Sequence, residues 1–249
     1  MKKNLFILSG IVSILLIWAI LSFFSLVSPV FLPSPFAVFK KLFILFLSGN
    51  IFPSLFATLY RWLIGFLLGS IIGILLGLVI GSSENLYYFF EVPIDFFRSL
   101  PSISLLPLLV LFFGIGDLPK FVIIVFSSVL FMAVNTSYGV RYANEDKIRY
   151  IKTLNATKFQ IFKKVILPEA MPSIFAGLRI TLSIALIVTV GSEMILGTGQ
   201  GLGKLMSDVI VTYKTTDFYS VIIITGALGY FSNKLFRRFE DKIIHWKGK

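Results

Sequence analysis

The glycine-rich segment from Gly197 to Lys204 is the part of the sequence that looks most like a site for chemistry. It reads Gly-Thr-Gly-Gln-Gly-Leu-Gly-Lys, and glycine-rich loops can bind phosphate through backbone N–H groups. A phosphate-binding loop that ends at Gly203-Lys204 requires glycine at position 198 and serine or threonine at position 205. The chain has Thr198 and Leu205 there, and the dinucleotide pattern fails because position 204 is lysine. We therefore expect a flexible outer loop here, with no nucleotide bound.

Catalysis and metal binding find little support elsewhere in the chain. There is no cysteine, and the single histidine, His245, is close to the C-terminus. Thiolate chemistry, a histidine metal cluster and a catalytic triad are thereby excluded. The sequence predicts no catalytic residue, no metal ligand and no cofactor, which argues against an integral membrane enzyme.

The composition is that of a membrane protein. Of the 249 residues, 57% are hydrophobic and 14% are charged, whereas soluble domains carry about 25% charged residues. The apolar residues form runs of about 20, the length of helix that crosses a bilayer. The net charge of +11 comes from basic residues between and beyond these runs, so it indicates membrane topology rather than nucleic-acid binding.

The apolar runs predict an all-α, polytopic transmembrane bundle of about six spans. Between the first two spans, residues 36–46 look like an amphipathic interfacial helix, and residues 86–98 are expected at the cytoplasmic interface. Asp117, Pro119 and Lys120 are expected to form a short turn, and a basic tail begins at Lys234. The predicted spans are residues 5–27, 62–81, 100–116, 121–140, 174–196 and 218–233.

The distribution of basic residues predicts the orientation. With a cytoplasmic N-terminus, 16 of the 23 basic residues fall in cytoplasmic segments and 6 in outer segments. Cytoplasmic loops of membrane proteins are enriched in Lys and Arg. We therefore expect a multi-pass protein of the plasma membrane with both termini in the cytoplasm.

Five glycines in the second predicted span recur at every fourth position: Gly65, Gly69, Gly73, Gly77 and Gly81. Residues four apart lie on one side of a helix. Glycine on such a stripe lets a second helix backbone approach closely in lipid. The stripe predicts tight helix packing, which we favour over a direct role in solute passage.

Three polar residues inside predicted spans are candidates for function. Glu193, nearer the outer end, is expected to form part of a gate or to line a solute pathway, since intramembrane charges face the bundle or a wet cavity. Asn135 is either a pathway residue or a partner in an interhelical hydrogen bond. Arg179 lies near the inner end of its span, where its side chain can extend to the interface, so we expect a structural role.

The longest cytoplasmic loop, residues 141–168, predicts a helix, a sharp turn and a second helix. Leu154 ends a helical apolar pattern, and Asn155 follows it, a residue that tolerates the left-handed conformation at a helix end. Thr157 and Gln160 match a capping box that starts the next helix, and Leu167-Pro168 is expected to end it.

This loop carries an apolar face in the cytosol. That face either packs back on the protein itself or binds a groove on a partner protein, as amphipathic helices do. Leu154 and Phe159 flank the predicted turn and are the expected contact residues.

The loop is similar to the ATPase-coupling loop of ABC importer permeases. The family pattern is Glu-Ala-Ala, three residues, Gly, and then Leu-Pro about a dozen residues later. This chain has Leu154-Asn155-Ala156-Thr157 and then Val165-Ile166-Leu167-Pro168, and it departs from the pattern at Arg149-Tyr150-Ile151 and at Asn155. The resemblance covers roughly residues 33 to 240 and is greatest to the sulfonate, taurine, nitrate and thiamine-precursor branch. Other segments that resemble the family are 105–109, 113–116, 135–136, 139–141, 176–179, 192–194 and 201–203.

The resemblance implies a type I importer fold and a permease subunit that forms the path of a small solute. It implies three kinds of partner: cytoplasmic ABC ATPase subunits, an extracytoplasmic solute-binding protein, and a second permease subunit, with a homodimer favoured. It divides the chain into residues 1–53, a permease domain at 54–240 and a basic tail at 241–249. A secondary transporter driven by an ion gradient is the alternative, but Glu193 alone would qualify as its coupling carboxylate.

Overall fold

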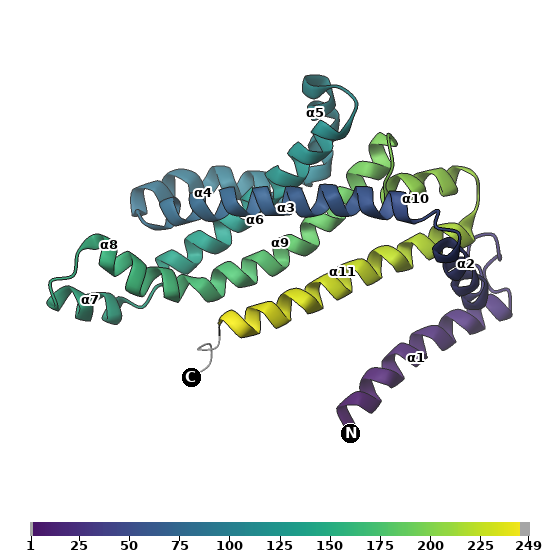
Figure 1. Ribbon diagram of the computed structural model, residues 1–249, viewed down its shortest axis with the longest axis horizontal. Helices are drawn as coiled ribbons and strands as arrows, with labels where there is room; N and C mark the ends of the chain where they lie inside the picture. The colour runs from purple at the N-terminus through teal and green to yellow at the C-terminus, as the bar shows by residue number, and fades with distance from the viewer. Residues whose placement is uncertain (1, 245–249) are drawn as a thin grey trace.

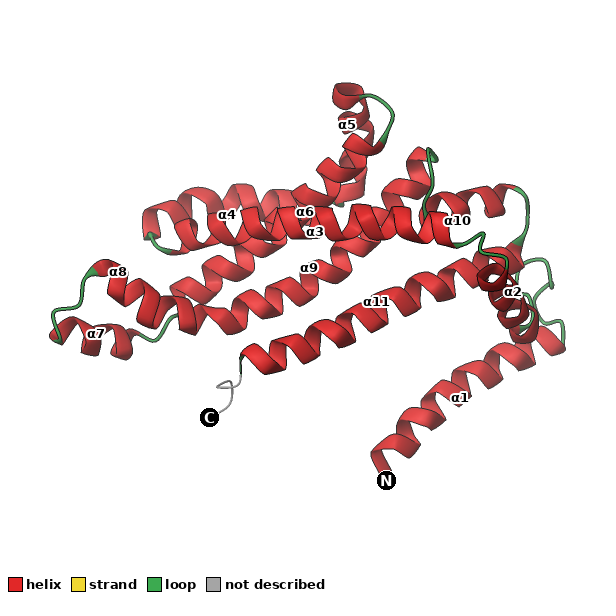
Figure 2. Ribbon diagram, in the orientation of Figure 1, coloured by secondary structure: helices red, strands yellow, loops and turns green. Residues whose placement is uncertain are grey.

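Residues 2–244 are described by the computed structural model, and the regular structure in that range is entirely helical. Four long helices run side by side along the molecule (Figures 1 and 2): α3 (Phe52–Gly81), α6 (Asp117–Arg141), α9 (Leu167–Leu196) and α11 (Thr215–Ile243). The short helix α10 (Leu202–Val211) lies at one end, called the α10 end. The helix α7 (Glu145–Thr153) lies at the other, called the α7 end. The predicted all-α bundle is confirmed.

The helices support fewer complete spans than the six predicted. Among the described residues, three helical segments are long and apolar enough to cross a membrane: Phe52–Gly81, Asp117–Arg141 and Lys158–Leu196. They correspond to the second, fourth and fifth predicted spans. The apolar part of α1 (Lys2–Phe23) is shorter, at Leu8–Phe23. The last predicted span lies in α11 (Thr215–Ile243), which does not meet the same measure of length and apolarity.

The third predicted span, residues 100–116, does not form one long helix. Helix α4 (Glu84–Ser99) is followed by a 3-10 turn, η1 (Ser102–Leu105), and by α5 (Leu106–Phe113), and the two arms are bent by 88°. The break is at Leu100, which is extended (ψ 134°) because the following proline disfavours helical geometry in the residue before it. The pair therefore forms a fourth span only if it crosses as a bent unit, and residues 86–98 are one of its arms.

Three other predicted segments differ in form or in length from the structure. Asp117, Pro119 and Lys120 do not form a separate turn: they are the first turn of α6, where a proline is tolerated. The basic tail predicted from Lys234 is helical, because α11 continues to Ile243. The rest of the predicted tail, with His245, lies outside the described residues. The interfacial segment is helix α2 (Pro35–Leu47), capped by the Ser34 side chain, and Figure 1 shows it crossing the direction of the long helices.

The glycine stripe of α3 forms the main helix contact. Each of the five glycines faces α6 so closely that an added Cβ would overlap it. At Gly73 that atom would lie 2.6 Å from the Met132 Cβ and 2.7 Å from the Val129 oxygen. The predicted role of the stripe in close packing is confirmed. The α6 residues that meet it also recur at every fourth position: Ile124, Ser128, Met132, Thr136 and Val140.

Candidate functional site

The loop at the α7 end has the local geometry that its sequence predicts. Asn155 is left-handed (φ 56°), and its N–H donates to the Lys152 oxygen at 3.0 Å. Thr157 begins α8 (Lys158–Ile161) with a complete capping box, in which the Thr157 N–H donates to Gln160 Oε1 at 2.8 Å and the Gln160 N–H to Thr157 Oγ1 at 3.3 Å. The predicted helix, turn and helix are confirmed.

The second helix of the loop does not end at Leu167-Pro168. It passes through a π-helical turn, η2 (Phe162–Ile166), and Pro168 lies in the first turn of α9. Residues Lys158–Leu196 are thus one continuous helical segment of 39 residues. A force on α8 would reach the membrane helix directly.

Two apolar side chains flank the turn and point away from the protein. Leu154 is 63% exposed and Phe159 is 71% exposed. The alternative that the whole apolar face packs back on the chain is therefore wrong for these two residues, whereas Ile161 and Val165 do pack inward. Ala156, which lies between Leu154 and Phe159 in the sequence, is half-buried.

Arg149, which stands where the family pattern has glutamate, is also at the surface. Arg149 pairs with Glu145 one turn earlier on α7, at 2.9 Å, and both side chains are exposed. Such a pair contributes little to stability. The pair leaves the Arg149 side chain exposed to solvent.

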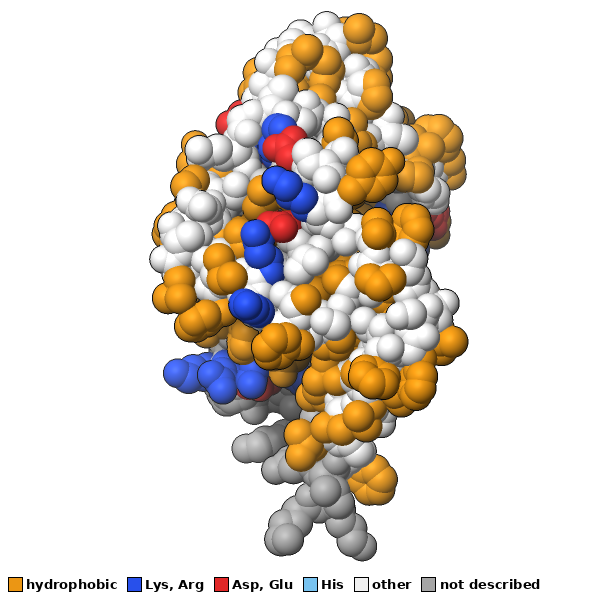
Figure 3. Space-filling model, turned by 90° about the vertical axis from the view of Figure 1, so that its right-hand side faces the viewer, with side chains coloured by type: hydrophobic (Ala, Val, Ile, Leu, Met, Phe, Trp, Pro, Cys, Tyr) orange, Lys and Arg blue, Asp and Glu red, His pale blue; other side chains and the backbone are white. Residues whose placement is uncertain are grey.

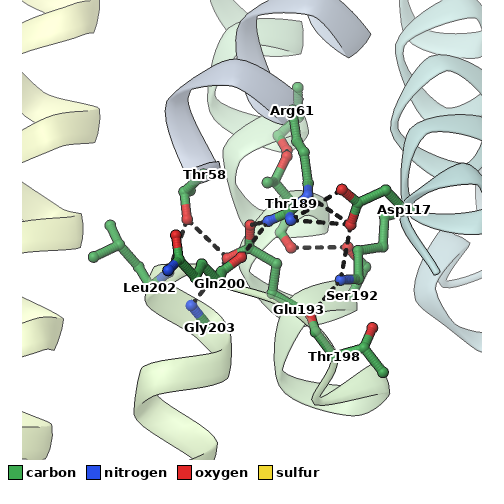
Figure 4. A network of polar contacts seen from close by, with 12 residues as sticks. Thr58, Arg61, Asp117, Thr189, Ser192, Glu193, Thr198, Gln200, Leu202 and Gly203 are labelled. Carbon is green, nitrogen blue, oxygen red and sulfur yellow. Dashed lines mark hydrogen bonds and ion pairs between the residues drawn. The ribbon is translucent and has the colours of Figure 1, made fainter. Parts of the chain in front are cut away.

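A second polar site, at the α10 end, centres on Glu193 (Figure 4). Its carboxylate is completely buried. It accepts hydrogen bonds from Thr58 Oγ1 at 2.8 Å, from Arg61 Nη1 at 2.7 Å and from the Gly203 N–H at 3.0 Å. Gly203 is in the first turn of α10, so the carboxylate occupies the anion-binding position at the N-terminus of that helix.

Arg61 joins Glu193 to α6. Its guanidinium also donates to both carboxylate oxygens of Asp117, at 3.1 and 3.2 Å. Lys120, with a fully buried side chain, donates to Asp117 at 3.3 Å and to the Thr198 oxygen at 2.8 Å. Two basic and two acidic groups therefore balance within this site, called below the Arg61–Glu193 cluster. Arg61 and Lys120 are two of the six basic residues counted above in outer segments, and their role in this cluster was not predicted.

The same cluster fixes the glycine-rich loop. Besides Thr198 and Gly203, the Gln200 oxygen accepts from Arg61 at 2.6 Å and the Leu202 N–H donates to Thr58 at 2.8 Å. A Cβ at position 201 would collide with the Glu193 carboxylate. The expectation of a flexible loop is therefore wrong: its glycines bring the backbone against buried charges. The N–H groups of Leu202 and Gly203 are already bonded to Thr58 and Glu193.

The other predicted residues lie apart from this cluster. The Asn135 amide donates to the Phe131 oxygen of its own helix at 2.8 Å, and the residue packs against Gly177 of α9. Arg179 pairs with Glu240 of α11 at 3.5 Å and keeps part of its side chain exposed. Asn135 and Glu193 are thus not brought together, and both contact neighbouring helices.

A helical membrane bundle with a capped, outward-facing helix–turn–helix loop at one end defines a class, the type I permeases of ABC importers. The fold matches a chain of the MetNI methionine ABC transporter in an inward-facing form, with a TM-score of 0.68 and 22% identity over 82% of this chain and 98% of that one. The chain belongs to the family of binding-protein-dependent transport system inner membrane components, whose sequence pattern matches residues 69–245.

Relatives in the family span nearly the whole chain. The taurine transport system permease protein TauC of Escherichia coli is 27% identical over 96% of this chain and 89% of its own. SsuC of Bacillus subtilis, whose name assigns it provisionally to aliphatic sulfonate transport, is 29% identical over 94% and 84%. The formylaminopyrimidine transport permease protein ThiX of Halalkalibacterium halodurans is 29% identical over 61% and 60%. This protein is accordingly a membrane-spanning permease subunit of an ABC importer.

Proposed function

We propose that this permease forms the path of a small organic sulfonate such as taurine, with a thiamine-precursor pyrimidine as the second candidate solute. The names of TauC, SsuC and ThiX support these two classes. The path would lie in the membrane bundle, with Asn135 and Glu193 beside it. Since Glu193 is fully bonded, its part would be to hold the outer gate in shape rather than to bind solute.

ATP would be hydrolysed on separate cytoplasmic subunits that bind the α7 end. The observation that carries this proposal is the exposure of Leu154 and Phe159 on a turn locked by Asn155 and the Thr157 capping box. An apolar pair presented on a rigid cytoplasmic turn is suited to a groove on a partner. Closure of the ATPase would then move α8, and with it the continuous helix α9.

The α10 end would receive a solute-binding protein. Figure 3 looks onto this end and shows a row of basic and acidic side chains between apolar surfaces. Two ion pairs of this end are Lys41–Asp217, at 3.0 Å, and Lys204–Asp208. A mixed row of charges can orient a soluble partner and set its register.

A second permease subunit would complete the path, and a homodimer is proposed. Helix α5 projects from the bundle in Figure 1. Leu111 and Phe112 on α5, and Ile115 just after it, are highly exposed there. An apolar element that leaves its own bundle is suited to contact another copy.

The proposal is tested by reconstituting the permease in vesicles with its ATPase and its solute-binding protein. We expect labelled taurine to accumulate only when ATP reaches the ATPase, and to accumulate more than a labelled formylaminopyrimidine. Preference for the pyrimidine would select the second candidate. Accumulation driven by a sodium or proton gradient without the ATPase would contradict the importer mechanism.

A further inference from the structure

A basic pocket lies between α9 and α11, away from both sites described above. Its volume is about 600 Å³, and four cationic side chains line it together with one acidic residue, Tyr230 and Asn233. The cations are Arg179 of α9 and Lys234, Arg237 and Arg238 of α11, and the acidic residue is Asp241. The lining therefore has a net positive charge of three.

Most of this charge is not neutralised by the protein. Arg179 pairs with Glu240 at 3.5 Å. Within the described residues, Lys234, Arg237 and Arg238 take part in no ion pair, and Lys234 lies 5.8 Å from the Tyr230 ring centre. Cations gathered around a pocket repel one another, so an anion bound there would be stabilised.

The surroundings place the pocket at the level of lipid headgroups. Towards the α10 end, α11 is apolar from Val221 to Ile224, and beyond Asn233 it becomes basic. Tyr230, Phe231 and Leu235 are exposed beside the pocket. Aromatic residues next to basic ones are typical of the membrane–water interface, where acyl chains can cover the apolar side chains while a headgroup enters the pocket.

We propose that this pocket binds the phosphate group of an anionic phospholipid of the inner leaflet. Arg237 and Arg238 would contact the phosphate, and Lys234 with Tyr230 would flank the glycerol backbone. Guanidinium groups suit phosphate oxygens because they donate two parallel hydrogen bonds. Basic pockets between transmembrane helices are known to bind anionic headgroups.

The test measures binding of a fluorescently labelled phosphatidylglycerol to the purified full chain in neutral detergent. The double variant R237Q/R238Q should bind it on the order of 30-fold more weakly, as expected for the loss of two cations near an anionic surface. R237K/R238K keeps the charge and should retain most of the affinity. K152Q/K158Q removes the same charge from exposed positions on the loop at the α7 end, and its affinity should stay within about twofold of the unaltered protein's.

Competition distinguishes the sources of phosphate. Unlabelled phosphatidylglycerol should displace the probe, whereas phosphatidylcholine and millimolar inorganic phosphate should not. Equal displacement by phosphatidylcholine, or displacement by inorganic phosphate alone, would overturn the proposal. So would full binding by an R237Q/R238Q protein whose helical content and elution volume are unchanged.

Discussion

The Glu193 carboxylate meets donors from two distant parts of the chain: Thr58 and Arg61 on α3, and the backbone of Gly203 at the start of α10. A charge buried in a membrane protein is costly unless it is paired and hydrogen-bonded. Here Glu193 is paired with Arg61, and Arg61 is paired in turn with Asp117. The cluster therefore fastens the glycine-rich loop to the bundle.

Glu193→Gln should destabilise the protein much more than Glu145→Gln. Both changes remove a carboxylate from a pair with arginine, at 2.7 Å and 2.9 Å, but only the first pair is buried. Breaking a buried pair costs about 3 kcal/mol or more, whereas an exposed one is worth under about 0.5 kcal/mol. Thermal unfolding in detergent measures the difference, and equal midpoints for the two variants would show that the buried cluster does not stabilise the fold.

Asn155→Val should loosen the cytoplasmic turn, whereas Asn155→Gly should not. A β-branched residue in the left-handed region costs about 1–2 kcal/mol, and glycine carries no such penalty. Trypsin cleavage at Lys152 or Lys158, on either side of the turn, reports local opening. We expect cleavage to be faster in the valine variant by about 5-fold to 30-fold. An unchanged rate would mean that the left-handed turn does not hold the loop.

At this scale, sequence reasoning succeeded where the cause is local. The turn at Asn155 and the capping box from Thr157 to Gln160 depend on residues within five positions of one another. Arg61 was missed because its partner Glu193 is 132 positions away. An arginine beside an apolar run, together with one intramembrane glutamate, was the available signal for that pair.

At the scale of elements, the contact of α3 with α6 is a stripe of glycines against a matching ridge. Because the five glycines have no side chain, the α6 backbone carbonyls approach to where a Cβ would stand, as at Gly77, where that atom would be 2.6 Å from the Ala133 oxygen. Close approach increases dispersion contacts, which are a main source of helix association in lipid.

Gly73→Leu should therefore disrupt assembly, and two controls separate its cause. Gly226→Leu introduces the same side chain into α11, at a place with no heavy atom within 4 Å of an added Cβ. Leu75→Ala alters an exposed position on α3 itself. We expect the yield of monodisperse protein in detergent to fall severalfold for Gly73→Leu alone. Equal yields for the three variants would refute the close contact.

The sequence showed the stripe but not what it packs against. Glycine at every fourth residue reveals one face of α3. The matching α6 residues, such as Ser128 and Met132, are of mixed type and give no such signal. The bend at the start of the third predicted span was missed for a different reason. Apolarity alone cannot show a bend, although Pro101 marked the place where it falls.

At the scale of the whole molecule, the two ends differ in kind. The α10 end is closed by the Arg61–Glu193 cluster, and the α7 end presents exposed apolar residues on a rigid turn. Figure 1 shows α11 running from the α10 end towards the α7 end, and α1 beginning below the middle of the molecule. The bias of basic residues predicts that both termini are cytoplasmic.

The orientation can be measured directly because the chain has no cysteine. Single replacements Lys152→Cys and Lys249→Cys should be protected from a membrane-impermeant maleimide in intact cells and become labelled after permeabilisation. Lys214→Cys should be labelled in intact cells. Labelling of position 249 from outside would contradict the proposed topology.

The central claim is that the loop at the α7 end transmits the work of the ATPase, and Phe159→Asp tests it most directly. The substitution places a charge on the exposed apolar surface and lies outside the long apolar part of α9, so insertion into the membrane should be normal. Tyr213→Asp is the matched control, an equally exposed aromatic residue at the α10 end.

The measurement is the amount of ATPase that co-purifies with equal amounts of each permease variant. Loss of a central apolar contact costs about 2 kcal/mol or more, so Phe159→Asp should weaken the association by roughly 30-fold or more. Tyr213→Asp should retain the association at its normal level. Full co-purification with Phe159→Asp, in a permease that inserts normally, would contradict the assignment of this loop as the coupling element.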